Sequence, residues 1–175
     1  MSPHVWDGIT VVPITALRGR RYHAAETAYL MHWVMHPDPG SVFEQRSKWI
    51  RRLFFSWAPE RAIIRFLTAL RYNGFLFVEN GAVVGHVFYQ QHKDALHMFS
   101  VSVRKELEGQ GRATEQLKYF VHAAHDMPEI TRVRLGAGGH GAVRRMVEKM
   151  ERCEVTFPFS ICMEEDGWVH FAGKL

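Results

Sequence analysis

The chain has 175 residues, of which 47% are hydrophobic and 23% charged, and its formal net charge is +4. This length and composition fit a single domain, residues 1–175, with one hydrophobic core. They provide neither an apolar run long enough to cross a bilayer nor a dense run of basic residues. The mild positive charge suits an anionic ligand such as a nucleotide cofactor, so nucleic acid is the less favoured partner.

The two cysteines, Cys153 and Cys162, match no metal-binding spacing and form no disulfide framework. We interpret them as reduced, structural thiols. The N-terminus contains Pro3, Asp7 and Gly8, and it does not resemble a signal peptide. A cytoplasmic protein is therefore expected.

The N-terminal part is expected to form one strand followed by helices. Residues 8–14 are rich in β-branched side chains and predict the strand, and residues 17–36 show helical periodicity. Ser41 begins a capping box that predicts a second helix. Pro59 suits the first turn of a third helix, which Asn73-Gly74 is expected to end.

The remainder of the chain is expected to alternate between strands and helices. Asn80-Gly81 predicts a hairpin turn between two apolar runs. The predicted strands are 75–79, 82–90, 95–103, 131–137, 155–163 and 168–172, and the predicted helices are 114–124 and 141–152. Because a helix connects residues 95–103 to residues 131–137, these two strands are expected to pair in parallel within a mixed sheet.

Residues 103–114 are the most informative stretch of the chain. They read Val-Arg-Lys-Glu-Leu-Glu-Gly-Gln-Gly-Arg-Ala-Thr and lie between a predicted strand and a predicted helix. Gly109 and Gly111 would let main-chain amides approach a phosphate at the helix N-terminus, and Arg112 adds positive charge. The stretch therefore predicts a phosphate site, and a tight turn with no ligand is the alternative.

This stretch and the order of elements resemble the GNAT superfamily of acyl-CoA N-acyltransferases over nearly the full length. The family motif is a strand ending in Val, then, five residues on, Gln or Arg, any two residues, Gly, any residue, and Gly or Ala. Val103 and residues 108–113 match it with one departure, because Glu108 stands where the family prefers Arg or Gln. The resemblance implies an α+β GNAT fold: a mixed, mostly antiparallel sheet flanked by helices in a three-layer α/β sandwich.

The resemblance also implies an N-acyltransferase of the EC 2.3.1 class that uses acetyl-CoA or another acyl-CoA. Loop amides would hold the CoA pyrophosphate, and the end of the preceding strand would pair with the pantetheine arm. The residues carried over for the donor are Val101, Ser102, Val103, Glu108, Gly109, Gln110, Gly111, Arg112, Ala113 and Thr114. Because Glu108 departs from the motif, the donor stays open between acetyl-CoA, a longer acyl-CoA and an acyl carrier protein.

His97 is the candidate general base. It lies six residues before Val103 and shares a strand face with Phe99 and Val101. A histidine titrates near neutral pH, which suits deprotonation of an amine. In GNAT members such as the aralkylamine acetyltransferases, a histidine at this offset helps to relay the proton. An exposed strand-end histidine with no catalytic role is the alternative.

The general acid is harder to assign. Many relatives carry a tyrosine on the last helix, but residues 141–152 contain none. His140 precedes that helix, where the helix dipole favours neutral imidazole, and it is the second catalytic candidate. Capping of the helix by His140 is the alternative. The missing tyrosine also keeps open a non-catalytic domain that senses CoA or binds a partner.

The other expectations concern metals and partners. His32 and His36, like His122 and His125, have helical spacing but no third ligand, so no metal is expected. The aromatic segment 41–72 is expected to line an apolar pocket for an aromatic or lipid-like acceptor or for a long acyl chain, and packing in the core is the alternative. An RNA substrate has only the basic charge in its favour, and a homodimer is compatible with the sequence.

Overall fold

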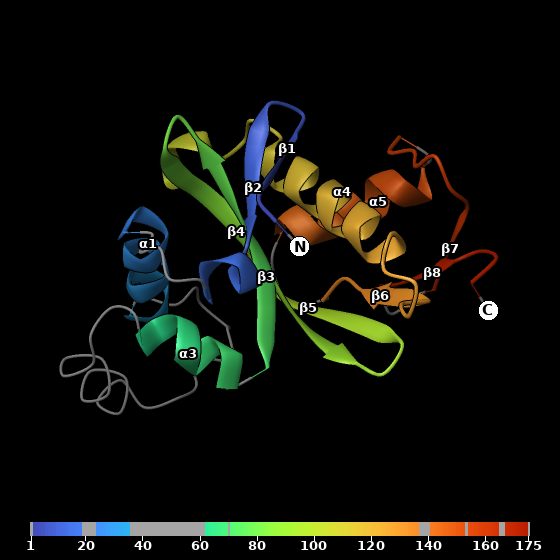
Figure 1. Cartoon of the computed structure of the whole chain (residues 1–175). Helices are drawn as coiled ribbons and strands as arrows, with labels where there is room; N and C mark the ends of the chain where they lie inside the picture. Colours follow the sequence, from blue (N-terminus) through green and yellow to red (C-terminus); the bar gives the residue numbers. More distant parts are fainter. Residues whose placement is uncertain are drawn as a thin grey trace. The chain divides into compact units, whose positions relative to one another are not determined.

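The computed structural model describes residues 2–18, 24–35, 62–69, 71–136, 141–152, 154–164 and 167–174. The chain divides into two compact units, Met1–His86 and Val87–Leu175 (Figure 1). Strand β4 (Ala82–His92) begins in the first unit and ends in the second. The single domain over residues 1–175 stays a prediction.

The first unit joins antiparallel strands to short helices. Strand β2 pairs with β1 through a turn at Asp7 and Gly8, which have positive φ angles of 46° and 79°. On its other side β2 pairs with β3 in the antiparallel direction. The elements are β1 (His4–Trp6), β2 (Ile9–Pro13), η1 (Ile14–Arg18), α1 (Ala24–Met35), α3 (Ala62–Ala69), β3 (Tyr72–Glu79) and the start of β4.

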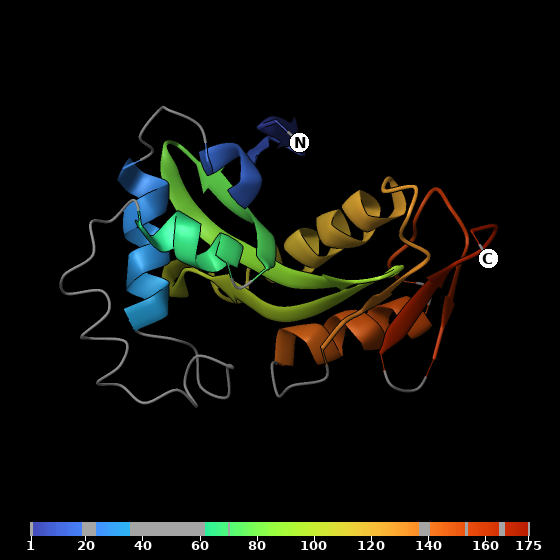
Figure 2. The ribbon, with the colours of Figure 1, turned by 60° about the horizontal axis from the view of Figure 1, so that its bottom comes forward.

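The two helices of the first unit pack together and bury apolar side chains. Figures 1 and 2 both show α1 and α3 side by side. Ile63 and Leu67 lie on the buried side of α3, as its apolar stripe predicts. A buried histidine of β4, His86, shares a 2.8 Å hydrogen bond between its Nδ1 and the Tyr29 hydroxyl of α1. This bond satisfies a polar side chain inside the core.

The second unit builds a mixed sheet around one parallel pair. Its strand order is β4-β5-β6-β8-β7, in which β5 and β6 are parallel and β6, β8 and β7 are antiparallel neighbours. The elements are β5 (Ala95–Val103), η2 (Lys105–Leu107), α4 (Arg112–His125), β6 (Arg132–Arg134), α5 (Gly141–Glu151), β7 (Ile161–Met163) and β8 (Trp168–Phe171). The predicted α+β class with a mixed, mostly antiparallel sheet is confirmed.

In the second unit, one face of the sheet forms a hydrophobic core. Leu96, Val133 and Val169 pair across β5, β6 and β8, and all three are fully buried. Helix α4 contacts β5 and β6 and buries Leu117 and Phe120. Because side chains alternate along a strand, the residues on either side of this apolar row point to the opposite face.

Three predicted boundaries were wrong. Residues 155–160 do not continue β7, because Pro158 lacks the N–H that a ladder needs, and Phe157 and Phe159 pack instead on His122. Asn73-Gly74 lies inside β3, where strand formation overrides the turn preference of this pair. Strand β6 is shorter than predicted, and β1 was not predicted at all. Among the described helices, none combines the length and the apolar character needed to span a membrane.

Candidate functional site

Strand β5 carries predicted site residues at both of its ends. His97 is the third residue of the strand, and Val101, Ser102 and Val103 end it. Val101 is buried, whereas Ser102 and Val103 are half-buried. The six-residue separation between His97 and Val103 spans roughly 20 Å at about 3.3 Å per residue. The strand therefore separates two regions that differ in their construction.

The loop after β5 owes its shape to two left-handed glycines. Gly109 and Gly111 have φ angles of 80° and 78°, which side-chain-bearing residues rarely adopt. A Cβ atom at either position would meet no atom within 4 Å. Backbone conformation therefore explains the glycines at these positions, and the space left by the absent side chains stays open to a ligand.

The loop fits a phosphate-bearing donor such as CoA. Gly111 is the N-cap of α4 and no side chain caps the helix there, so the first-turn amides have no side-chain acceptor at this position. Glu108, Gly109 and Gln110 are exposed, and Arg112 is half-buried at the first helical position. Helix N-terminal amides and a nearby guanidinium are groups that bind phosphate. The role of these residues in binding the donor stays a prediction.

The pairing of β5 with β6 stops part-way along β5. The last parallel pair is His97 with Arg134, so Phe99 and Val101 extend beyond the paired region. Gly136 still lies close to β5, because a Cβ there would come within 2.8 Å of the Met98 carbonyl oxygen. A side chain at residue 136 would therefore push this segment away from β5, at the point where the pairing of β5 with β6 ends.

His97 lies among aromatic and cationic side chains of the second unit. Its ring meets the rings of His92 and Trp168 edge-on, with centroids 4.9 Å and 5.0 Å away. Burial, together with the positive charges of His92, Arg134 and Arg132, holds the pKa of His97 below its ordinary value. The imidazole is therefore neutral at neutral pH and able to accept a proton, which a general base must do.

Trp168 and Arg134 were not identified from the sequence. Trp168 is the β8 partner of Arg134, which is in turn the β6 partner of His97, so the three lie in one row across the sheet. The Arg132 and Arg134 guanidinium carbons lie 4.9 Å and 5.8 Å from the Trp168 ring centre. The alternation of Arg132, Val133 and Arg134 is typical of a strand with one polar face, but no local pattern indicates which strands are its neighbours.

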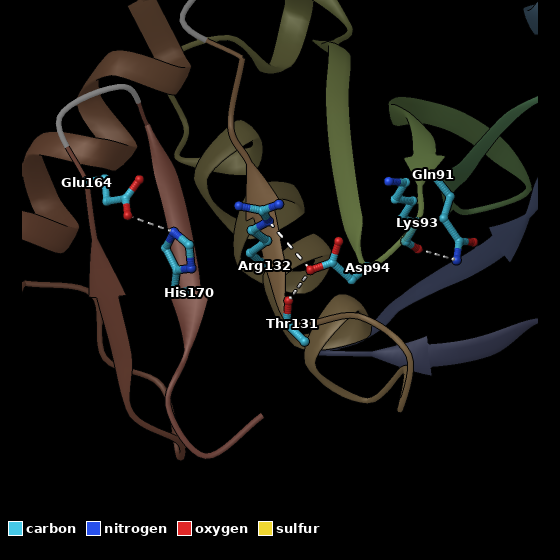
Figure 3. Close-up of polar contacts among 7 residues, drawn as sticks. All are labelled: Gln91, Lys93, Asp94, Thr131, Arg132, Glu164 and His170. Atoms are coloured by element: carbon cyan, nitrogen blue, oxygen red, sulfur yellow. Dashed lines mark hydrogen bonds and ion pairs between the residues drawn. The ribbon is translucent and has the colours of Figure 1, made fainter. Parts of the chain in front are cut away.

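Polar contacts hold the edge of this face (Figure 3). The Thr131 hydroxyl donates to Asp94 at 2.8 Å, and Arg132 Nε lies 3.7 Å from the same carboxylate. The hydrogen bond from Thr131 is the main reason that the pKa of Asp94 is lowered. On β8, His170 Nε2 lies 3.1 Å from Glu164 Oε1. In the hairpin between β4 and β5, the Gln91 amide donates to the Lys93 carbonyl.

One of the predicted site residues, His140, lies outside the described part of the chain, so its catalytic or capping role stays a prediction. Most of the aromatic segment 41–72 also lies outside it. Within the described ranges, no group of three or more His, Cys, Asp or Glu side chains comes together that could hold a metal ion.

Comparisons with known proteins place the chain in a family. Residues 28–151 match the model of the acetyltransferase (GNAT) family. A structure described as a GNAT family acetyltransferase from Elizabethkingia anophelis with acetyl-CoA bound has a TM-score of 0.50 at 14% identity, and the match covers 94% of this chain and 96% of that one. No match was found among curated proteins.

Two further structures match at lower TM-scores. A GnaT-family acetyltransferase from Bordetella pertussis has a TM-score of 0.49 at 13% identity, with 97% of each chain covered. The N-acetyltransferase PseH of Campylobacter jejuni has a TM-score of 0.48 at 13% identity, with 94% of this chain and 97% of that chain covered. The family match spans more than half of the sequence and includes β5, the glycine loop and α4. This chain therefore belongs to the GNAT acetyltransferase family.

Proposed function

We propose that this chain is an acyl-CoA-dependent N-acyltransferase of the EC 2.3.1 class, with acetyl-CoA as its first candidate donor. Its acceptor would be a primary amine of a small molecule. The observation that carries the proposal is the layout of β5, which joins the glycine loop at one end to His97 at the other.

The residues have distinct roles in this proposal. The amides at Gly111 and in the first turn of α4 hold the phosphates, and the last residues of β5 align the donor arm by main-chain pairing. A bound acyl-CoA would supply a thioester. Direct attack by the amine would form the amide and break the C–S bond, and the CoA thiolate that leaves would take up a proton from solvent. His97 takes the proton that the amine loses, through a water molecule, because its lowered pKa keeps it neutral before the reaction.

His140 is the second catalytic candidate in the proposal, through a hydrogen bond to the donor. We place the enzyme in the cytoplasm, where thiols stay reduced; Cys162 is a free, exposed thiol. Two alternatives remain: transfer from an acyl carrier protein, and a domain that senses CoA without catalysis. In the first, the carrier protein would have to bind beside the exposed Glu108. The experiment must separate both alternatives from the proposed enzyme.

The experiment combines binding with turnover. The purified chain is titrated with CoA and with an acyl carrier protein, and is then incubated with saturating acetyl-CoA and a panel of primary amines while thiol release is followed. We expect CoA binding and amine-dependent thiol release. CoA binding with no turnover on any amine would contradict the enzyme proposal, and binding of the carrier protein in place of CoA would contradict the donor.

A further inference from the structure

The row that contains His97 also contains Arg134, for which the described residues supply no ion-pair partner. Arg132 has the Asp94 carboxylate 3.7 Å away, and Glu164 is in contact with His170. Arg134 has no carboxylate within ion-pair distance among the described residues, and its guanidinium lies over the Trp168 ring. A guanidinium in this position is available to an anion from outside the chain.

Trp168 restrains this guanidinium. The guanidinium carbons of Arg132 and Arg134 lie 4.9 Å and 5.8 Å from the centre of the indole ring. The His97 ring contacts the same indole edge-on, at an interplanar angle of 88°. Cation–π contacts restrict the freedom of an arginine side chain before a ligand arrives. Trp168 is thus a positioning residue for Arg134. Because the Arg134 side chain is already restrained, it loses less conformational entropy on binding an anion than an unrestrained arginine would.

The register sets where that anion would lie relative to the proposed base. Arg134 is the direct parallel partner of His97, and paired strands lie about 4.8 Å apart. A molecule whose carboxylate binds Arg134 would therefore present its amine within reach of His97. A phosphate of the donor is a poorer candidate for this place, because the glycine loop begins roughly 20 Å further along β5.

We propose that Arg134 binds a carboxylate of the acceptor, so that amino acids, and not simple amines, are the substrate class of this enzyme. The inference rests on the proposed function only for the transfer step. Binding of the carboxylate to Arg134 needs no donor and can be measured without turnover.

The test compares amines that differ only in the carboxylate. Phenylalanine and phenethylamine are one such pair, and each other amino acid is paired with its decarboxylated amine. We expect the wild type to favour the best amino acid over its amine by about 10- to 100-fold in kcat/KM, as for a charge-assisted hydrogen bond. Arg134→Gln should abolish this preference by raising KM for the amino acid, and Arg134→Lys should restore part of the preference. Arg145→Gln, which removes an exposed charge on α5, is the matched control and should keep the preference.

A binding measurement separates the two proposals. Amino acids and amines are titrated without donor, and the side-chain NMR signals of His97 and Trp168 are followed. Selective amino-acid binding that Arg134→Gln removes supports the inference even where no turnover occurs, in which case the proposed function fails alone. Turnover with no preference for the carboxylate, or no binding by any amino acid, overturns the inference. It is also overturned if Arg134→Gln weakens CoA binding instead, because Arg134 would then hold the donor.

Discussion

The two ends of β5 carry two regions that are built in different ways. The glycine loop, residues 103–114, is local in sequence and presents main-chain groups around Gly109 and Gly111. The row of His97, Arg134 and Trp168 presents side chains from three strands. The first region depends on backbone conformation and the second on strand register.

This difference predicts how each region responds to substitution. In the loop, most side chains should tolerate substitution as long as the left-handed glycines remain, because main-chain amides are the proposed phosphate ligands. In the row, the side chain is the functional group, and the pKa of His97 depends on neighbours from other strands. Substitutions in the row should therefore change kcat, whereas substitutions in the loop should change the dissociation constant for CoA.

The largest effect is expected in the row. His97→Ala should lower kcat by about 10²- to 10⁴-fold, since it removes the proposed base. In the wild type, kcat/KM should rise with pH through an inflection below the ordinary pKa of histidine, because burial and the nearby cations lower the pKa of His97. His122→Ala is the control, since burial also lowers the pKa of His122 but it lies on α4. An unchanged rate and pH profile in His97→Ala would remove His97 from the mechanism.

A smaller effect is expected from the loop backbone. Gly111→Val places a β-branched residue at a φ of 78° and should weaken CoA binding by about tenfold or more, measured by calorimetry. Gly173→Val is the matched control, because Gly173 has a φ of 86°, has open space around it and lies after β8. Gly173→Val should lower the free energy of unfolding by about as much as Gly111→Val does, but it should leave the affinity for CoA unchanged. Equal CoA affinity in both variants would show that the loop does not bind the donor.

The loop side chain that departs from the family motif should matter less. Glu108 is exposed, so Glu108→Gln should change the dissociation constant for CoA by less than about fivefold, as expected for a surface charge. The measurement is made at low and high salt, because screening should remove whatever difference exists. A change of a hundredfold or more would mean that the Glu108 carboxylate lies at the phosphates.

The smallest effect is expected at the edge of the row. The pKa of Asp94 is lowered in the folded state, so its contribution to stability is present above the ordinary pKa of a carboxylate and is lost as the pH falls through the lowered value. Asp94→Asn should therefore lose less stability than the wild type on acidification, as measured by thermal unfolding between neutral and acidic pH. Identical acid dependence in Asp94→Asn and the wild type would contradict the role of the bond from Thr131.

The elements of the second unit were predicted well where the signal is local. Strand β5 was predicted over residues 95–103, and helices α4 and α5 were predicted within two residues of their observed ends. The Asn80-Gly81 turn was predicted from its residue pair, and both residues have positive φ. Residues 155–160 were predicted wrongly as strand because their apolar character reflects packing on α4, which no local pattern distinguishes from pairing.

The sequence by itself determined the family motif, the glycine loop and the order of strands and helices in the second unit, because each depends on residues that are neighbours in the chain. Only the tertiary structure decided which side chains surround His97. Arg134 and Trp168 are 37 and 71 positions away from it, and the register of β5, β6 and β8 brings them together. Pairing between distant strands is set by the burial of Leu96, Val133 and Val169 on the opposite face, a cooperative property of the folded sheet.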